Sequence, residues 1–343
     1  MDEDPPTPLA QTAFADVPRR QGKPLDMRSL KRTIAWRREI ARGHEESARR
    51  CRPARLVTEC PACEGGRHEL FVQIHGFDYR ECARCGHLFL HNPPAPEAIA
   101  AIYQGVTAQA QVYVGEELFR RRVEQIARPK AAFCREHIEP AGEWFDVGCG
   151  TGELLSVVRD LGWEPRGSEA DPAHVAFARN QGLAVELGYV DELAPELAES
   201  VRVISALNLL EHLPDPKAWL ARLTAGLCTG GYVVVEVPRH PSLSSFSNLL
   251  YPKLAARHIY PPDHLHIFTE PSLEWVLAAS GLRARAVWVF GQDFQELMYS
   301  SAASAGLPES KLFHRILDAA GPIQSAIDAE NLSDVLFVVA QKR

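Results

Sequence analysis

The sequence has no apolar stretch long enough to cross a membrane and nothing like a secretory leader. Among its 343 residues no run approaches the roughly 18 apolar residues that a membrane span needs, and the acidic N-terminus lacks the basic-then-apolar order of a signal peptide. Aromatic residues are scarce at 8%, yet 46% hydrophobic and 24% charged residues are typical of a globular protein. We therefore expect a cytoplasmic protein without membrane contacts that forms one full-sized domain and a smaller module.

The eight cysteines are not distributed as in a disulfide framework. Four of them form two Cys-x-x-Cys pairs, Cys60 with Cys63 and Cys82 with Cys85. Eighteen residues separate the pairs, a spacing that lets two tight turns bring four thiolates into a tetrahedron around zinc. Gly86, and Gly65 with Gly66, permit positive-φ turns that point backbone amides at sulfur. Because four cysteines leave no open coordination position, we predict a structural zinc ion, with a redox pair as the alternative.

The N-terminal part holds most of the positive charge. Residues 1–28 are rich in proline and show no apolar periodicity, so we expect a disordered tail. Residues 19–55 contain thirteen Lys or Arg and four Asp or Glu, so the rest of the chain carries −16 within a total of −7. An exposed basic helix is predicted over residues 29–55. It either contacts nucleic acid or another acidic partner, or packs lightly on the acidic body of the protein, which we favour.

From residue 141 onward apolar strand patterns alternate with helical patterns as far as residue 238. Such a series predicts an α/β fold with a parallel, doubly wound sheet. A stretch rich in proline and histidine follows at about 239–270, and we expect it to be a substrate-cap insertion. Residues 95–140 read as a helical linker or cap between the cysteine module and this domain. No internal repeats are present.

Three glycines at alternate positions, Gly148, Gly150 and Gly152, follow the first strand directly and open the next helix. Without side chains they let a ligand approach the backbone at the carboxyl ends of the strands, where doubly wound sheets bind ligands. Glu169, at the end of the next strand, is placed to accept hydrogen bonds from two ribose hydroxyls. NAD binding uses the same geometry, but its fingerprint requires glycine or alanine where this chain has Glu153, whose charge would repel a pyrophosphate.

Four segments in order resemble the successive motifs of class I S-adenosylmethionine-dependent methyltransferases: FDVGCGTGELL, GSEADP, VISALNLLEHLPDP and LTAGLCTGGYVVVEVP. The resemblance covers about residues 143–238 and weakens through DHLHIFT and the last strand. It implies a Rossmann-like methyltransferase domain over residues 141–343 that uses S-adenosylmethionine.

The resemblance also implies a set of cofactor contacts. The methionine part is bordered by Asp146, Gly148, Cys149, Gly150 and Gly152, the ribose is held by Glu169, the adenine lies near Ala170, Val190 and Asp191, and the methyl-donor pocket is lined by Asn208 and Leu209. Asp171 is a competing ribose ligand, although its place before Pro172 suits a helix N-cap better.

Three histidines are candidates for a general base. Methyl transfer from a sulfonium is an in-line displacement, so the protein mainly positions the acceptor and removes its proton. His212 follows the fourth strand beside the predicted donor pocket, and its alternative interpretation is a positional histidine bonded to a neighbouring loop. His264 and His266 alternate along an extended segment and so face the same side, with Asp263 as an orienting carboxylate.

Glu211 and His212 together suggest a divalent metal, as in some phenol O-methyltransferases. A third carboxylate is missing, because Asn208 stands where it would be expected. We therefore discount metal-assisted catalysis.

The cysteine module, expected over residues 56–94, resembles zinc ribbons that precede the catalytic domain in bacterial methyltransferases acting on sugars and natural products. A second resembling group, ribosomal RNA guanine methyltransferases, uses its zinc module to grip RNA. The ribbon here has three arginines against five acidic residues and no dense basic and aromatic surface. We therefore expect methyl transfer to oxygen or carbon of a small molecule, such as a sugar or a secondary-metabolite precursor. The alternatives are an RNA methyltransferase and a non-catalytic zinc-dependent binding scaffold.

Overall fold

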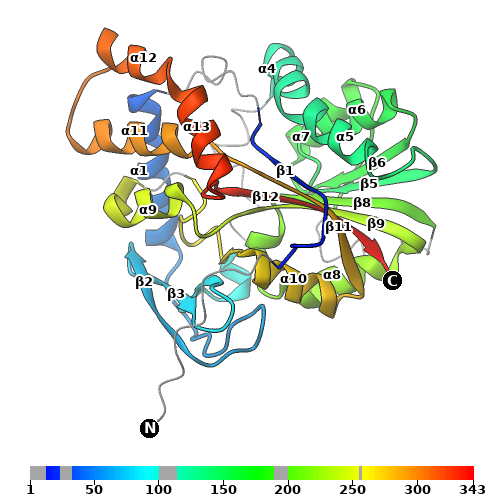
Figure 1. Ribbon diagram of the computed structural model, residues 1–343, viewed down its shortest axis with the longest axis horizontal. Helices are drawn as coiled ribbons and strands as arrows, with labels where there is room; N and C mark the ends of the chain where they lie inside the picture. The colour runs from blue at the N-terminus through cyan, green and yellow to red at the C-terminus, as the bar shows by residue number, and fades with distance from the viewer. Residues whose placement is uncertain (1–12, 24–32, 100–113, 189–199, 255–256) are drawn as a thin grey trace.

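The computed structural model describes residues 13–23, 33–99, 114–188, 200–254 and 257–343 (Figure 1). These residues form an eight-stranded sheet and a four-stranded sheet. The strands of the large sheet are β1 (Arg19–Gln21), β5 (Glu143–Val147), β6 (Glu164–Glu169), β7 (Ala184–Leu187), β8 (Val201–Leu207), β9 (Leu227–Pro238), β11 (Leu282–Phe290) and β12 (Val335–Lys342). The strands of the small sheet are β2 (His68–Ile74), β3 (Phe77–Cys82), β4 (Leu88–Leu90) and β10 (His266–Ile267).

The helical segments lie before, between and after these strands. They are α1 (Ile34–Arg50), α4 (Glu116–Arg122), the π-helical segment η2 (Val123–Ala127), α5 (Arg128–Arg135), α6 (Glu153–Asp160), α7 (Pro172–Asn180), the 3₁₀ turn η3 (Leu210–His212), α8 (Pro216–Ala225), α9 (Leu243–Leu250), the 3₁₀ turn η4 (Pro252–Leu254), α10 (Glu270–Ala279), α11 (Asp293–Ser304), α12 (Lys311–Leu317) and α13 (Ala320–Ala329). No helix in these described ranges combines the length and the apolarity that a membrane span requires.

The large sheet has the strand order β1-β11-β12-β9-β8-β5-β6-β7. Strands β5 to β9 are parallel to one another, whereas β12 runs antiparallel between β9 and β11. The run Val233, Val234 and Val235 is fully buried, as expected for a strand covered on both faces. The α/β doubly wound fold predicted from the sequence is therefore confirmed, with an antiparallel pair added at one side.

Helices cover both faces of this sheet. In Figure 1, α5 and α6 lie above the strands, and α8 and α10 lie below them. Along β5 the side chains alternate, so Trp144 belongs to the core beneath α5 and α6 while Phe145 belongs to the core with α8 and α10. Because β5 pairs in parallel with β6 and with β8, the carboxyl ends of these strands lie together at one edge of the sheet.

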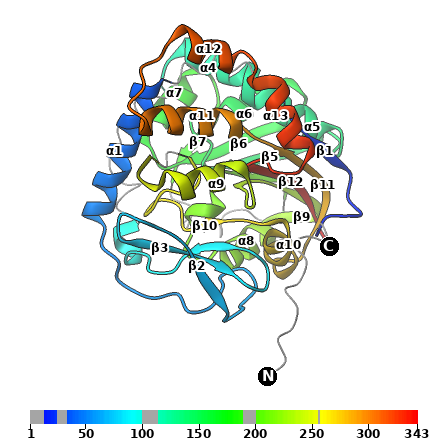
Figure 2. The same ribbon diagram turned by 60° about the vertical axis from the view of Figure 1, so that its left-hand side comes forward.

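The basic segment forms α1, which is packed against the body along one side. Figure 2 shows α1 beside α11, with the small sheet beneath both. Arg37 is 1% exposed and forms an ion pair with Glu296 of α11. Arg49 and Arg50, by contrast, lie in solvent and pair with acidic residues one turn earlier on the same helix. The inner face of the basic helix therefore packs on the body of the protein, which is the interpretation that we favoured.

The segment expected to be a disordered tail contributes an edge strand. Within residues 1–28, Arg19–Gln21 forms β1, which pairs in parallel with β11. Arg19 forms an ion pair with Glu270, and Arg20 forms one with Glu136 at 2.5 Å. The expectation of a structureless tail is therefore wrong for these residues, because their partners lie more than a hundred positions away and leave no local pattern.

The small sheet is completed by the insertion rich in proline and histidine rather than by the cysteine module alone. Its order is β10-β4-β3-β2, and β10 comes from the stretch predicted to be a cap insertion, about 239–270. The hydroxyl of Thr269 donates a hydrogen bond to the carbonyl of Cys85 at 2.5 Å. The cysteine module is thus joined to the large domain through a shared sheet.

Candidate functional site

The glycine loop makes the sharp turn from β5 into α6. Gly148, Gly150 and Gly152 have φ values of 68°, 56° and 86°, a region that other residues rarely adopt. A Cβ atom on Gly152 would lie 2.4 Å from Cδ1 of Leu183, so close packing as well as φ requires glycine there. The amides of Gly148 and Cys149 both donate to the carbonyl of Ser168 at the end of β6. The loop is therefore held against the neighbouring strand.

Glu169 lies over this loop at the end of β6. Its carboxylate accepts hydrogen bonds from the backbone amides of Gly150 at 2.8 Å and of Asp171 at 2.9 Å. The carboxylate of Asp171 points elsewhere and accepts from the amides of Ala173 and His174 as the N-cap of α7. Of the two acids that compete for the ribose, only Glu169 contacts the glycine loop, and Ala170 lies half-buried between them.

Asp146 is the buried carboxyl group of the site. Burial raises its pKa from 3.8 to about 7, against the effect of a hydrogen bond from the Ser205 hydroxyl at 2.5 Å. The Ser205 hydroxyl in turn accepts from the indole N–H of Trp144 at 2.7 Å. Sequence reasoning missed Ser205, although a serine inside the apolar strand β8 is a visible exception to its pattern.

The charge of Glu153 is neutralised within the protein. Arg122 of α4 donates through Nε to its carboxylate at 2.5 Å, and the Glu153 side chain is 9% exposed. Paired in this way, Glu153 does not repel a pyrophosphate as an isolated charge would, and the sequence pattern did not reveal this contact. The preference for S-adenosylmethionine must stand on other observations.

The carboxyl ends of β8 and β9 add a second polar group of residues. Asn208 adopts a φ of 53° and donates through its side chain to Glu236 at 3.0 Å. Lys130 of α5 forms an ion pair with the same carboxylate at 2.6 Å, and this ammonium lowers the pKa of Glu236. Leu209 packs near Gly148, since a Cβ atom placed there would lie 3.6 Å from its Cδ1. Asn208 and Leu209 thus lie beside the glycine loop.

Lys130 and Glu236 were not found from the sequence. Glu236 interrupts the apolar run of β9, which is the signal that could have singled it out. Val190 and Asp191, expected near the adenine, lie outside the residues that the structure describes.

Comparison with known proteins identifies the domain that contains this site. The family model described as "Methyltransferase domain" matches residues 119–287. The chain carries a class I S-adenosylmethionine-dependent methyltransferase domain. The resemblance noted in the sequence motifs is thereby confirmed.

Relatives of the methyltransferase domain include enzymes with assigned names. The ubiquinone biosynthesis O-methyltransferase of Xanthomonas axonopodis pv. citri is 36% identical over 101 residues, which are 27% of this chain and 42% of that protein. The protein of the same name from Stutzerimonas stutzeri is 29% identical over 120 residues, which are 33% of this chain and 52% of that protein. The chain spans about half the length of the curated relatives it matches.

Solved structures resemble the chain only distantly. A SAM-dependent methyltransferase from Archaeoglobus fulgidus has 18% sequence identity and a TM-score of 0.45, with 66% of this chain and 98% of that chain covered. A likeness at this level carries no information about activity.

Two of the three candidate histidines face each other next to the methyltransferase domain's donor edge. The rings of His212 and His264 lie edge to face with centroids 4.6 Å apart. Nδ1 of His212 lies 2.8 Å from the carbonyl of Asp263, and Nδ1 of His264 lies 2.6 Å from that of His258. Asp263, which we expected to orient His264 and His266 through its carboxylate, contacts His212 through its backbone carbonyl.

His266 lies in a different setting, between the methyltransferase domain and the small sheet. Its Nδ1 is 3.1 Å from Nε2 of His87, and its Nε2 is 2.9 Å from the carbonyl of Leu213. Burial lowers the pKa of His212 and of His266 to about 4, and it lowers that of His264 well below its usual value. All three imidazoles are therefore neutral at pH 7.

The four paired cysteines form one buried cluster. The sulfurs of Cys60, Cys63, Cys82 and Cys85 all lie within 4.8 Å of one another. The turn after the second pair uses Gly86 with a φ of 70°, as expected, but the turn after the first uses Glu64 with a φ of 61° instead of Gly65 or Gly66. The Arg84 amide points at the sulfur of Cys82 at 3.4 Å. Four buried sulfurs in two matched turns fit the donor set of a zinc ribbon.

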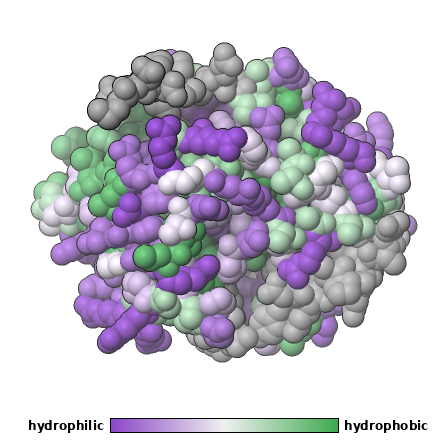
Figure 3. All heavy atoms as spheres, turned by 90° about the horizontal axis from the view of Figure 1, so that it is seen from below, coloured by the Kyte–Doolittle hydropathy of each residue, from purple (hydrophilic) through white to green (hydrophobic). Residues whose placement is uncertain are grey.

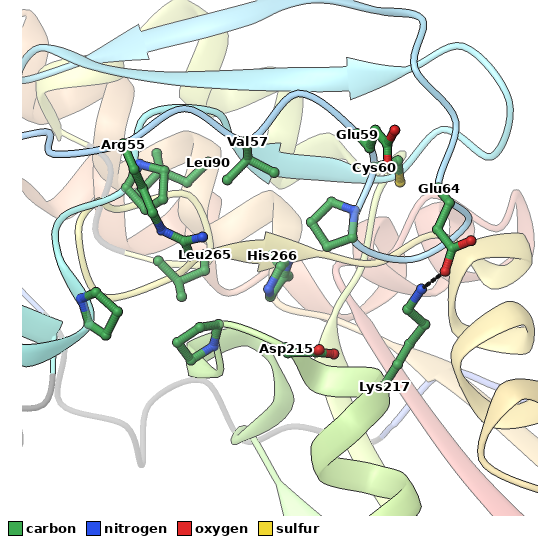
Figure 4. Close-up of a pocket in the computed structure, with 14 residues that line it drawn as sticks. Arg55, Val57, Glu59, Cys60, Glu64, Leu90, Asp215, Lys217, Leu265 and His266 are labelled. Carbon is green, nitrogen blue, oxygen red and sulfur yellow. Dashed lines mark hydrogen bonds and ion pairs between the residues drawn. The ribbon is translucent and has the colours of Figure 1, made fainter.

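A pocket of about 440 Å³ opens between the cysteine module and the methyltransferase domain (Figure 4). Arg55 and Cys60 line one side, and Asp215, Lys217 and His266 line the other. Figure 4 shows Lys217 paired across the opening with Glu64. No residue of the glycine loop lines this pocket, so it is separate from the predicted donor site.

Proposed function

We propose that the protein transfers the methyl group of S-adenosylmethionine to an oxygen or carbon atom of a small molecule. The observation that carries this proposal is the contact of the Glu169 carboxylate with the Gly150 amide at 2.8 Å. A carboxylate at this position can exchange that contact for two ribose hydroxyls, while the three glycines leave the loop backbone open to the ligand.

The donor contacts follow from this arrangement. Asp146, Gly148, Cys149, Gly150 and Gly152 would border the methionine part, with Glu169 on the ribose and Ala170, Val190 and Asp191 near the adenine. Asn208 and Leu209 would line the pocket of the transferred methyl group. The donor carries a positive sulfonium, so the carboxylate of Glu169, which contacts backbone amides and no cationic side chain among the described contacts, favours it over a pyrophosphate.

The reaction requires the protein mainly to position the methyl donor and the acceptor. The acceptor atom attacks the methyl carbon in line with the departing sulfur, so the protein holds the two in register and takes up a proton from a hydroxyl acceptor. His212 and His264, neutral and next to Asn208 in the fold, are the candidates for that base. His266 is the third candidate, and its two ring nitrogens contact His87 and the Leu213 carbonyl.

A structural zinc ion in the cysteine cluster completes the proposal. Cys60, Cys63, Cys82 and Cys85 would hold it as thiolates and so fix the small sheet. Because β10 shares that sheet, the zinc also supports the segment that carries His264 and His266.

A small-molecule acceptor is supported by two observations. The name of the curated relatives denotes O-methylation in ubiquinone biosynthesis, which is chemistry on a small molecule. On the cysteine module, Arg84 stacks on Trp275 at 4.5 Å and donates to the carbonyl of Cys63, so it is occupied within the protein. Figure 3 shows hydrophilic and hydrophobic side chains interspersed on the lower face.

The experiment uses S-adenosylmethionine labelled in its methyl group, the purified protein, and a cell extract separated into metabolite, RNA and protein fractions. The proposal predicts label in the metabolite fraction. Label confined to RNA would establish the RNA methyltransferase alternative, and no label in any fraction, together with no donor binding, would establish the binding scaffold.

A further inference from the structure

Lys23 is a buried lysine whose ammonium group has no carboxylate of its own. The residue is 8% exposed. Within the described ranges it forms no ion pair and no side-chain hydrogen bond, and its Nζ atom lies over the face of the Phe290 ring, 5.3 Å from the ring centre. A ring face attracts a cation far less than a carboxylate does, and a buried charge without a partner is costly. Such a group is suited to a ligand that brings the missing negative charge.

The backbone next to Lys23 is fixed to the large sheet. The Gly22 amide donates to the carbonyl of Val289 at 2.8 Å, and the indole N–H of Trp288 donates to the carbonyl of Gly22 at 2.8 Å. Strand β1 is parallel to β11, and β12 is antiparallel to both β11 and β9, so β1 and β9 run in the same direction (Figure 1). Lys23 therefore follows the carboxyl end of β1, at the edge of the sheet where the glycine loop also lies.

Two other cationic side chains stand near Lys23, and each already has a carboxylate. Lys130 forms an ion pair with Glu236 at 2.6 Å, and Arg257 forms one with Asp334 at 3.1 Å. Burial lowers the pKa of Lys23 from 10.5 to about 7, and the charges of Lys130 and Arg257 lower it further, against the effect of Glu236. Three cationic groups thus share two carboxylates at this point.

The remaining buried acids nearby do not supply a third carboxylate. Asp293 is 0% exposed, and its pKa is raised well above the usual value by burial and by the neighbouring Asp334 carboxylate, which favours its protonated form. Its carboxylate also accepts from the Ser244 amide at 3.0 Å. Glu296 already forms a buried ion pair with Arg37. Neither acid therefore gives the lysine a counter-charge.

We propose that the methyl acceptor carries an oxyanion, a carboxylate or phosphate group apart from the methylated atom, and that the ammonium of Lys23 binds it. This inference rests on the proposed function, because it names the class of acceptor for that site. Asn208 links the lysine cluster to the predicted donor pocket, since its side chain donates to Glu236 at 3.0 Å. With the ligand bound, three cations meet three anions, and a hydrogen bond between two charged groups is among the strong ones.

The first test follows the charge of Lys23 directly. The Cε signal of this lysine is recorded by nuclear magnetic resonance in the isotopically labelled, donor-free protein, and it is assigned by its absence from the Lys23→Met spectrum. In chloride the titration should show a pKa of about 7. Acetate or inorganic phosphate at the same ionic strength should raise it by about 1 to 3 pH units, because an opposite charge nearby favours the ammonium form.

The comparison of salts decides between binding and screening. A higher pKa in acetate, in phosphate or in both, relative to chloride, supports the site and shows which oxyanion it accepts. The same pKa in all three salts overturns the proposal. This measurement uses the unchanged protein, so it holds even where a variant fails to fold.

The second test asks whether the acceptor itself is anionic. The metabolite fraction of a cell extract is divided by anion exchange into a retained and an unretained part, and each is incubated with the labelled methyl donor and the protein. Label should enter the retained part. Lys23→Met should need about 10- to 100-fold more of that part to reach half of its maximal rate, with the maximal rate and the affinity for S-adenosylmethionine little changed.

Lys311→Met is the matched control, because it removes an exposed lysine at the start of α12 and should behave as the unchanged protein does. Label only in the unretained part, or a Lys23→Met variant that loses maximal rate without needing more acceptor, overturns the proposal. If no part is labelled, the proposed methyl transfer fails, and the titration of Lys23 still decides whether the anion site exists.

Discussion

The carboxylate of Glu169 and the backbone amide of Gly150 are joined by a hydrogen bond of 2.8 Å. This contact links the end of β6 to the glycine loop after β5, two elements that lie about twenty residues apart in the chain. It holds the carboxylate over the loop before any ligand arrives, so a donor does not have to order it on binding.

Glu169→Gln should lower the affinity for S-adenosylmethionine by about 10- to 100-fold, because a hydrogen bond to a charged group contributes about 1.5 to 3 kcal/mol. Asp171→Asn is the matched control, since it removes the same charge two residues away. Its carboxylate caps α7, a role that asparagine also fills, so donor affinity should stay within about twofold. Calorimetry measures both. The reverse order of effects would make Asp171 the ribose ligand.

Gly152→Ala should destabilise the folded protein and weaken donor binding. The new Cβ atom would lie 2.4 Å from Leu183 at a φ of 86°, so the loop must move. Strain and overpacking of this kind cost about 1 to 3 kcal/mol. Gly321→Ala, with nothing within 4 Å of its Cβ and a place in α13, should keep or raise the melting temperature. An unchanged melting temperature in Gly152→Ala would show that Leu183 does not pack this closely against Gly152.

Much of the donor site was predictable because its signals are local. The glycine spacing, the strand before it and the acid at the end of the next strand all lie within about thirty residues. Periodicity alone therefore indicated the doubly wound sheet and its binding edge.

The contacts that were missed join distant segments. Arg122 reaches Glu153 from a separate helix, Lys130 reaches Glu236 from another, and β1 pairs with a strand more than 260 positions later. A charged residue reads as solvent-exposed in a sequence, and only tertiary packing shows which of these charges are buried together. For the same reason, the sequence did not show that His264 lies beside Glu211.

Cys63→Ser should reduce bound zinc and lower the melting temperature, because three thiolates hold the ion less well than four. The loss should reach the large domain through β10 and the Thr269 contact to Cys85. Cys228→Ser, outside the cluster, is the control and should retain zinc. Elemental analysis with thermal unfolding decides the matter. Full zinc content in Cys63→Ser would exclude this cysteine as a ligand.

The unfolding free energy should fall as the pH rises from about 4 to about 7, owing to Asp146. Its pKa is raised from 3.8 to about 7 in the folded protein, so over this range the unfolded chain has lost the proton that the folded protein keeps. The slope from this group is at most roughly 1.4 kcal/mol per pH unit. Asp146→Asn should remove that part of the slope in denaturant unfolding of the donor-free protein. An identical slope in the variant would mean that Asp146 ionises normally.

The most direct test of the central claim is calorimetric titration of the unchanged protein with S-adenosylmethionine and, separately, with NAD. The loop at Gly148 to Gly152 and the Glu169 carboxylate predict one S-adenosylmethionine per chain and no heat of binding with NAD. Binding of NAD, or no binding of S-adenosylmethionine, would contradict the assignment of this loop as a methyl-donor site.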